Sequence, residues 1–410
     1  MTFTRPDKPL LSSNLPASAE DLEGGGGDSY LYGTPEPNEA MSHTRFKVKF
    51  AFFSKLRMFV RDRASWVKWL AAASLLFIIW RLLRAFGPPG TGLENMPEYG
   101  VSLGCDDSKD YHGLIFTVGT IHPELAQHSL DLRGGVVGTV HILQGDSDAI
   151  DVKYEIRTYT DSKELGSQFA VKSPRPDDVL SGRDLSRVEV ATPIDLDRSC
   201  MRYDMKLILP PRLRELHIRA LSTTQIKMSP LAEVVLDKLV VNMYGTDVRN
   251  MLLVSKTFHA NLSDFSLTRG WLVGSNQISN RTVISTHLGD AVTDLHIAPS
   301  PSAANGTGLA ELQTTTGAGR TNIFYKRRPE SGRPIRSTHN SWHRSGDIYL
   351  DYSQAKFQGK VNIAAKSFNA PGLKQKNGVG WMFVGDQDVD ELIIASKGWV
   401  GLDLGALSAS

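Results

Sequence analysis

The stretch VISTHLGDAVTDLHI, residues 283–297, decides the fold because it holds two short apolar strands joined by one polar corner. Its form is an apolar strand, then Ser or Thr, then Gly, then a second strand. The same form returns in LQTTTGAGRTNIFY (312–325), THNSWHRSGDIYLDY (338–352) and IIASKGWVGLDL (393–404). Short strands with such corners, and almost no helical periodicity, are typical of all-β domains. We therefore predict stacked coils of parallel strands, a β-solenoid, with a large β-sandwich as the alternative.

Strand-like pieces extend in both directions from this stretch. Toward the N-terminus, apolar and polar residues alternate from Ser129 onward, and a polar loop at 172–187 interrupts them. A loose repeat begins near residue 213, which divides the domain into an N-terminal β region (101–212) and a β-solenoid repeat region (213–405). The loop at 327–345 is expected to break the repeat, and residues 234–239 also fit one helical turn. The main strands expected are 129–132, 140–143, 150–156, 205–209, 216–218, 226–228, 234–243, 251–258, 265–267, 283–284, 295–297, 323–325, 348–350, 361–363 and 392–394.

Three segments carry a resemblance to a known family. They are the proline step LILPPRLRELHIRAL (207–221), the run KLVVNMYGTDV (238–248) and the strand GDIYL (346–350). With them, residues 101–405 resemble the putative-adhesin β-solenoid domains of bacterial and fungal surface proteins. The resemblance implies a β-helical architecture, and it supplies no active-site residues.

Residues 69–80, WLAAASLLFIIW, form an apolar run without charge, proline or glycine. Extended to 66–86, the segment is about 30 Å long as a helix, which is enough to cross a bilayer core. The prolines at 88 and 89 end it, because proline blocks helix continuation. We expect a transmembrane helix at 66–86, with an interfacial amphipathic helix as the main alternative, ahead of a cleaved signal peptide or a core helix. The residues expected at the membrane interface are Trp66, Lys68, Trp69, Trp80, Arg81 and Arg84.

The net charge of +2 is small, but its distribution is uneven. Eight basic residues lie between Arg45 and Lys68 against the single acid Asp62, whereas residues 85–108 contain no Lys or Arg. The positive-inside rule therefore places the N-terminus in the cytosol, as in a single-pass type II signal-anchor protein. Composition predicts a disordered cytosolic tail (1–44), a basic juxtamembrane segment (45–65) and a Pro/Gly-rich stalk (87–100). The expected partners are the lipid bilayer and, through residues 45–68, anionic cytosolic lipids, with nothing to indicate nucleic acid.

Two features fit a domain in the secretory-pathway lumen or at the cell surface. Cys105 and Cys200 are the only cysteines, and in an oxidising compartment such a pair is a disulfide candidate, with two unrelated buried thiols as the alternative. The acceptor pattern N-x-Ser/Thr occurs at Asn261, Asn280 and Asn305, all beyond the apolar segment. These three asparagines are the predicted N-glycosylation sites of a glycoprotein.

Two classes of enzyme that act through paired carboxylates are considered, because the sequence contains several closely spaced aspartates. Type II glycosyltransferases often hold a nucleotide-sugar metal on an Asp-x-Asp pair, but their fold needs βαβ units, and that alternation is not found. A carbohydrate-active enzyme on a β-helix needs two carboxylates in one groove, and spacing alone does not show that any converge. The candidate carboxylates are Asp195 and Asp197, Asp347 and Asp351, and Asp386, Asp388 and Asp390.

The remaining signals are weak. His339 and His343 are four residues apart, but they lie in a basic, Ser-rich loop without an evident third metal ligand. Exposed tryptophans can stack on sugars, although core packing is the usual role of any one of them. The tryptophans concerned are Trp271, Trp342, Trp381 and Trp399.

These observations favour a membrane-anchored protein whose extracytosolic β-domain is an adhesin-like scaffold or binding module without enzymatic activity. Its ligand is expected to be a glycan or a protein. No catalytic, cofactor-binding or metal-binding residue is predicted, and no cofactor. The alternatives are a β-helical carbohydrate-active enzyme and, with less support, a type II glycosyltransferase.

Overall fold

The computed structural model describes a domain that is almost entirely β-structure. Among the described residues, 23 strands form one hydrogen-bonded sheet, beside the short 3-10 helix η3 (Val101–Leu103) and the helix α2 (Lys163–Gln168). The all-β prediction is therefore confirmed. The residues described are 69, 72–77, 92–105, 109–118, 126–173, 186–196, 199–287, 291–300, 308–326, 333–371, 373–375, 382–385 and 389–405.

Most strands belong to two parallel ladders, and the chain alternates between them. From β8 to β18 each even-numbered strand pairs with the next even-numbered one, and from β9 to β19 each odd-numbered strand pairs with the next odd-numbered one. The first ladder contains β2 (Gln127–Arg133), β6 (Arg187–Ala191), β8 (Glu215–Ala220), β10 (Val234–Met243), β12 (Phe258–Leu267), β14 (Arg281–Thr286), β16 (Ala310–Thr316) and β18 (Ile335–Ser341). The second contains β3 (Val137–Gln144), β7 (Met201–Leu209), β9 (Thr224–Met228), β11 (Met251–Val254), β13 (Trp271–Ile278), β15 (Val292–Pro299), β17 (Arg320–Tyr325) and β19 (Asp347–Asp351), and β4 (Val152–Thr160) extends it beyond β7 in the antiparallel direction.

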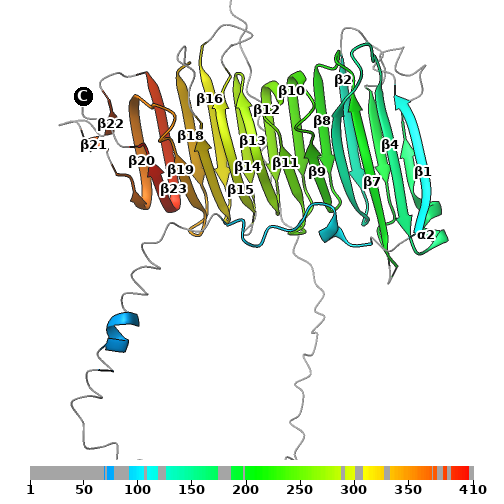
Figure 1. The fold of residues 1–410 in the computed structure, drawn as a ribbon, viewed down its shortest axis with the longest axis horizontal. Coiled ribbons are helices and arrows are strands. Elements are labelled where there is room, and N and C mark those ends of the chain that lie inside the picture. The colour runs from blue at the N-terminus through cyan, green and yellow to red at the C-terminus, as the bar shows by residue number, and fades with distance from the viewer. Residues whose placement is uncertain are drawn as a thin grey trace, which may run out of the picture. The chain divides into compact units, whose positions relative to one another are not determined.

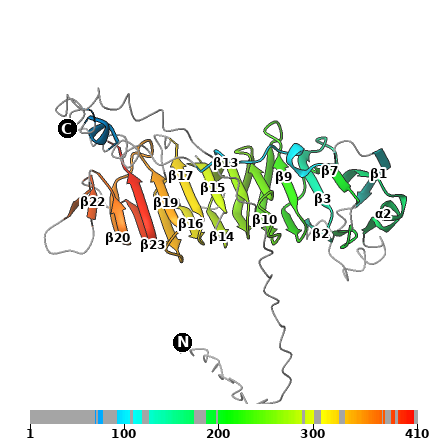
Figure 2. The same cartoon turned by 90° about the horizontal axis from the view of Figure 1, so that it is seen from below.

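Strand order in space departs from chain order at both ends of the stack. The last strand, β23 (Asp390–Asp403), pairs with β18 and β19 on one side and with the earlier strand β20 (Gly359–Asn369) on the other. Figure 1 shows red β23 between the orange strands β19 and β20, and Figure 2 shows the same order. At the other end, β6 and β7 pair with the outer sides of β2 and β3. Neither end of the stack therefore follows the order of synthesis.

Antiparallel strands border both ends. β4 pairs antiparallel with β7 and carries β1 (Lys109–Val118), while β5 (Ala170–Lys172) pairs antiparallel with β6. At the other end, β22 (Met382–Val384) pairs antiparallel with β20 and with β21 (Lys374–Gln375). These additions cover parts of the edges that a stack of parallel strands otherwise exposes to other chains.

The core lies between the two ladders, because side chains alternate between the two faces of each strand. Along β4, for example, every second side chain is buried, and Tyr154 and Ile156 are among them. The buried residues of both ladders form one continuous apolar cluster from Leu130 to Leu404. The outward-facing residues of each ladder are the ones available to ligands.

Two histidines are buried within this core. His128 and His339 are both fully buried, and each ring nitrogen has a hydroxyl partner. The pairs are His128 Nδ1 with Ser186 Oγ at 2.7 Å, His128 Nε2 with the Tyr154 hydroxyl, His339 Nδ1 with Thr314 Oγ1 at 2.8 Å, and His339 Nε2 with the Tyr352 hydroxyl at 3.1 Å.

Residues 92–105, called the strap here, lie along the outer face of the second ladder, as the thin segment beside β9 and β7 in Figure 2 shows. Gly100 N donates to Gln225 Oε1 of β9 at 2.5 Å, and Gln225 Nε2 donates to Ser102 Oγ at 2.8 Å. The last strap residue, Cys105, is joined by a disulfide to Cys200, with 5.7 Å between the α-carbons. From residue 92 onward, the segment predicted as a stalk therefore lies on the domain surface.

Two details of the sequence prediction are wrong, and one alternative beside the correctly predicted strand at 234–243 is not realised. The strand expected at 251–258 is two strands, because residues 255–257 turn the chain from β11 into β12. The loop expected at 327–345 contains β18, which continues the first ladder by pairing with β16. Residues 234–239 lie in β10, where pairing with β12 and β8 overrides their helical spacing.

The chain divides into two compact units, Met1–Gly87 and Pro88–Ser410. In the first unit, the structure describes residue 69 and residues 72–77, which are helical, and Trp69 is exposed. Within the described part of the chain, no helix reaches the length and apolar content that a membrane crossing needs. The predicted tail, the juxtamembrane segment and the interface residues Trp66, Lys68, Trp80, Arg81 and Arg84 lie outside the described residues.

Candidate functional site

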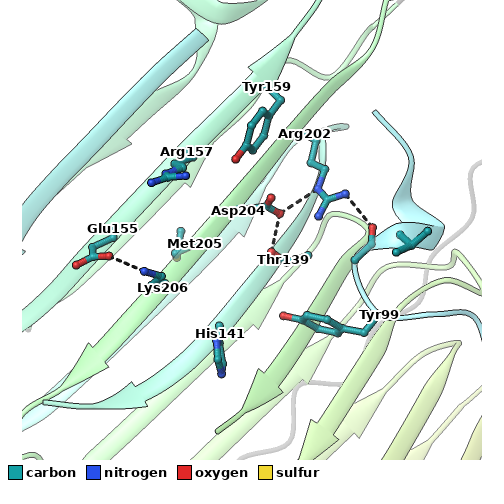
Figure 3. Close-up of a pocket in the computed structure, with 12 residues that line it drawn as sticks. Tyr99, Thr139, His141, Glu155, Arg157, Tyr159, Arg202, Asp204, Met205 and Lys206 are labelled. Carbon is teal, nitrogen blue, oxygen red and sulfur yellow. Dashed lines mark hydrogen bonds and ion pairs between the residues drawn. The ribbon is translucent and has the colours of Figure 1, made fainter. Parts of the chain in front are cut away.

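A groove on the outer face of the second ladder is the candidate functional site (Figure 3). Its volume is about 580 Å³. Strands β3, β4 and β7 form its floor, and the strap forms one wall. The side chains that line it and are used below are those of Tyr99, Thr139, His141, Glu155, Arg157, Tyr159, Arg202, Asp204 and Lys206.

The alternation of β4 and β7 explains why polar side chains meet on this floor. In β4 the apolar residues at 152, 154 and 156 face the core, so Glu155 and Arg157 face outward. The antiparallel register places Glu155 opposite Lys206 and Arg157 opposite Asp204. Directly opposed residues on one face lie within contact distance, so the floor carries opposite charges in alternation.

Both carboxylates of the floor are already engaged. Glu155 forms ion pairs with Lys153 and Lys206, each at 3.0 Å, and these hydrogen bonds hold the pKa of its carboxyl below the usual value. Asp204 accepts hydrogen bonds from Thr139 Oγ1 at 2.7 Å and from Arg202 Nε at 2.9 Å. A general acid needs a raised pKa, so Glu155 is unsuited to donate a proton to a glycosidic oxygen.

Two other groups in the groove have unused bonding capacity. Arg157 is exposed, and among the described residues its guanidinium forms no ion pair or hydrogen bond, as Figure 3 also shows. His141 Nε2 is shielded from solvent without a hydrogen-bond partner in the described part of the chain. Burial, followed by the charges of Lys227 and Lys206, lowers the pKa of His141, so its imidazole is neutral near pH 7. The groove therefore offers one unpaired guanidinium and one unpaired ring nitrogen.

Contacts with the neighbouring strands hold the strap in place as one wall of the groove. Arg202 Nη1 donates to the carbonyl of Gly100 at 2.9 Å, and the Tyr99 hydroxyl donates to the carbonyl of Val140 at 3.4 Å. The Nζ of Lys227 lies 5.5 Å from the centroid of the Tyr99 ring, within the range of a cation–π contact. Tyr99 therefore presents a fixed aromatic wall to any ligand in the groove.

This arrangement is suited to hold an anion. The two carboxylates are neutralised by lysine and arginine partners, whereas Arg157 keeps its full hydrogen-bonding capacity. An arginine fork binds carboxylate, sulfate or phosphate oxygens through two parallel hydrogen bonds. Tyr99 and Tyr159 add aromatic surface to the lining of the same groove.

The cysteine and asparagine candidates lie on the domain surface where the structure describes them. Cys105 and Cys200 form the disulfide that ends the strap. Asn261 faces outward from β12, where its Nδ2 donates to Asp237 Oδ1 at 3.2 Å, and Asn280 is exposed in the turn before β14. Because Leu262 is opposite Arg281, these two asparagines lie on adjacent coils. Asn305 lies outside the described residues.

The carboxylates considered for catalysis are not brought together where the structure describes them. Asp390 is buried and accepts from the backbone N of Ile335 and of Gln358, each at 2.9 Å, at the start of β23. Asp347 and Asp351 lie on β19, in the second ladder. Asp195 lies in the chain between β6 and β7, whereas Asp197, Asp386 and Asp388 lie outside the described residues.

The histidine and tryptophan candidates that the structure describes lie in different parts of the domain and do not form a common site. His339 is in the core, and His343 is in an exposed turn where its Nδ1 meets Ser345 Oγ at 2.8 Å, so the two do not form a metal site. Trp271 is buried on β13, with its Nε1 donating to the carbonyl of Val248. Trp342 is exposed and Trp399 is half-buried on β23, while Trp381 lies outside the described residues.

Sequence reasoning did not single out the groove residues. A signal was present, because the outward positions of the predicted strand at 150–156 include Lys153 and Glu155, and Arg157 follows in phase. Alternation identifies the face of a strand but not its neighbours. The pairing of β4 with β7 crosses 41 or more residues, and no local pattern encodes it.

Comparisons with known proteins give remote likenesses only. No family model matches the chain, and no curated protein matches its sequence. Among solved structures, a putative cell adhesion protein from Clostridium sporogenes is 12% identical with a TM-score of 0.17, covering 71% of this chain and 98% of that one. Putative adhesins from Parabacteroides merdae and Parabacteroides distasonis are 10% and 8% identical, with TM-scores of 0.34 and 0.33. They cover 71% and 72% of this chain and 95% and 98% of theirs. Because every TM-score is below 0.5, these likenesses establish neither a shared fold nor a shared function.

Proposed function

We propose that this chain is a single-pass type II membrane protein whose extracytosolic β-domain is an adhesin-like binding module without enzymatic activity. The observation that carries the proposal is the groove, where Arg157 is unpaired while Glu155 and Asp204 are neutralised. The ligand that fits is an extracytosolic glycan or protein that presents a carboxylate or sulfate group. Its charge would pair with Arg157, and its body would lie against Tyr99.

We further propose that the domain is a stacked-coil β-solenoid. Support comes from the pairing, since each coil of chain gives one strand to each parallel ladder and the next coil pairs in register with it. A β-sandwich built from hairpins and Greek keys would instead place antiparallel strands side by side along its whole length.

The membrane anchor and the topology belong to the same proposal. Their support is the apolar run at 69–80, the charge step from eight basic residues between Arg45 and Lys68 to no Lys or Arg at 85–108, and the helical conformation of residues 72–77. A disulfide between Cys105 and Cys200 fits an oxidising compartment, the secretory-pathway lumen or the cell surface. In that compartment Asn261, Asn280 and Asn305 are open to N-glycosylation, and residues 45–68 would contact anionic lipids on the cytosolic side.

The groove is tested by removing its unpaired cation. We expect Arg157→Ala to weaken binding of an immobilised anionic ligand at least about tenfold, because one charge-assisted hydrogen-bonded pair contributes about 1.5–3 kcal/mol. Heparin, polygalacturonate and polyglutamate would be compared by surface plasmon resonance on the detergent-solubilised full chain. The three probes separate sulfated glycan, carboxylated glycan and acidic peptide.

Arg219→Ala is the matched control, since Arg219 is exposed on β8 in the other ladder and its replacement removes the same charge. We expect the Arg219 variant to bind the probes as the parent chain does. Equal losses in both variants would mean that net charge alone attracts the probe. No binding of any probe by the folded parent chain would refute the groove as an anion site.

A further inference from the structure

Four ring side chains lie in a diagonal row on the same outer face, at the other end of the second ladder. They come from four adjacent strands and are called the aromatic strip here: His296 of β15, Phe324 of β17, Tyr349 of β19 and Trp399 of β23. The ring centroids are 5.1 Å apart for His296 and Phe324 and 5.9 Å apart for Phe324 and Tyr349. The strip is separate from the groove, which lies on β3, β4 and β7.

The parallel register and one glycine explain how the row continues to Trp399. His296 is directly opposite Phe324, and Tyr349 is directly opposite Gly401. The Trp399 ring and the Tyr349 ring both border the α-carbon of Gly401, and an added β-carbon there would collide with the indole. Gly401 therefore leaves room for Trp399 to lie beside Tyr349 on the sheet surface. The spacing of the rings is set by the spacing of strands in the ladder.

The rings keep one face toward the outside. His296 is exposed, and Phe324, Tyr349 and Trp399 are half-buried by one another and by the sheet. The described part of the chain places no second layer over these rings. Contiguous apolar side chains on such an outer sheet face commonly mark a binding surface. The ring planes are tilted to one another, by 32° between His296 and Phe324 and by 57° between Phe324 and Tyr349, so the rings form a stepped row along the sheet surface.

Carboxylates flank the strip. Asp351 and Asp403 lie opposite each other in register, on the strands that carry Tyr349 and Trp399. One oxygen of each is used locally, since Asp351 Oδ1 accepts from Ser353 N at 2.9 Å and Asp403 Oδ1 accepts from Gly405 N at 2.8 Å. Among the described residues, the Oδ2 atoms of both carboxylates have no partner. Burial, and then these two carboxylates, raise the pKa of Tyr349, whereas Arg320 acts in the opposite direction, so two negative charges and one positive charge lie near the ring.

We propose that the aromatic strip binds an uncharged, extended saccharide. Pyranose rings present flat C–H faces that pack on aromatic rings, and their hydroxyl groups would donate to the free oxygens of Asp351 and Asp403. A β-1,4-linked chain is flat, and one sugar ring follows the next at a spacing comparable to that of the ladder. The two carboxylates repel sulfated and uronic acid chains, so the strip selects against the ligands that suit the groove. The strip therefore does not depend on the anion site.

The test is calorimetric titration of the solubilised full chain with cellohexaose and with chitohexaose, two uncharged β-1,4-linked probes, and with maltohexaose, which is α-linked and coiled. We expect saturable binding of at least one β-1,4-linked probe and weaker binding of maltohexaose. Phe324→Ala and Trp399→Ala are each expected to lower the affinity at least tenfold. Asp403→Asn keeps the shape of the strip and is expected to lower the affinity about threefold. This variant tests the strip even if a ring variant does not fold.

Two control variants make the outcome decisive. Trp342→Ala removes an exposed tryptophan outside the strip and is expected to bind the probe as the parent chain does. Arg157→Ala is expected to do the same, which separates the strip from the groove. The inference is overturned if the folded parent chain binds neither β-1,4-linked probe, or if the strip variants bind as tightly as Trp342→Ala.

Discussion

At the scale of single residues, the two buried histidines show how the core accommodates polar groups. His128 and His339 lose all contact with solvent, and the cost of burying a charged imidazole lowers the pKa of each to about 3. Each ring instead stays neutral and forms one hydrogen bond through each nitrogen, to a Ser or Thr on one side and a Tyr on the other. From the sequence, His339 was considered only as a weak candidate metal ligand, because it is four residues from His343. That spacing does not show that His339 faces the core from β18 while His343 lies in the exposed turn after it.

These histidines predict how stability depends on pH. In the unfolded chain they take up protons near pH 6.5, whereas in the folded domain they do so only near pH 3. Their contribution to stability is therefore complete above pH 6.5 and is lost as the pH falls from 6.5 toward 3. The free energy of unfolding should fall by up to about 1.4 kcal/mol per pH unit for each histidine in that window.

The measurement is urea denaturation at a series of pH values. The double variant His128→Gln and His339→Gln should have a shallower dependence between pH 6.5 and pH 3, whatever its absolute stability. His343→Gln, which changes an exposed histidine, should keep the slope of the parent chain. Parallel slopes for the double variant and the parent would contradict neutral burial of the two rings.

At the scale of elements, the strap connects the start of the domain to its functional face. It has little regular structure apart from η3, and its position depends on contacts with β9, β7 and β3. The Pro and Gly content of residues 87–100 predicted a stalk that overlaps the strap, because composition reports the conformational freedom of a segment but not the surface on which it lies. Gln225, which the strap covers, is fully buried on the outer side of β9. The strand itself was predicted, but the neighbour that buries its outer face was not.

The disulfide should stabilise both the domain and the groove. Cys105 and Cys200 close a loop with a sequence separation of 95, and the chain-entropy model gives such a loop a stabilisation of about 2–5 kcal/mol. Denaturation of the double variant Cys105→Ser and Cys200→Ser, compared with the parent, measures this loss. Because the disulfide fixes the strap, which forms one wall of the groove, the double variant should also bind the anionic probes more weakly. An unchanged unfolding free energy would show that the strap is held by its hydrogen bonds alone.

At the scale of the whole molecule, local pattern predicted the class of fold and the position of most strands. The strands at 140–143, 205–209 and 226–228 lie within β3, β7 and β9, because alternation and turn residues are local properties. Strand order was not predicted at either end of the stack. Pairing of β3 with β7, or of β20 with β23, depends on residues far apart in the sequence, whose apolar faces are nearly interchangeable. The same limit explains why the groove and the aromatic strip, each made by several strands, were not foreseen.

The position of β23 predicts which part of the stack depends on the last strand. A chain that stops after residue 389 leaves β18, β19 and β20 without their shared neighbour. In repeat-like stacks, stability is carried mainly by contacts between neighbours, so the effect should be local. Hydrogen exchange should show loss of amide protection in β20 and β19, while β8 to β12 stay protected. Continued protection of β20 would mean that the antiparallel strands β21 and β22 suffice to hold it.

The place of β23 also has a consequence for how the domain is made. β20 leaves the ribosome before β23, yet in the finished domain β23 occupies the position between it and the coil of β18 and β19. The growing chain therefore cannot add its coils one after another to the end. Either β20 stays unpaired until residues 390–403 emerge, or it first pairs with the coil of β18 and β19 and is released when those residues arrive. Folding quality control would then act on a nearly complete domain, and the insertion of β23 between strands that are already present would be its last folding step.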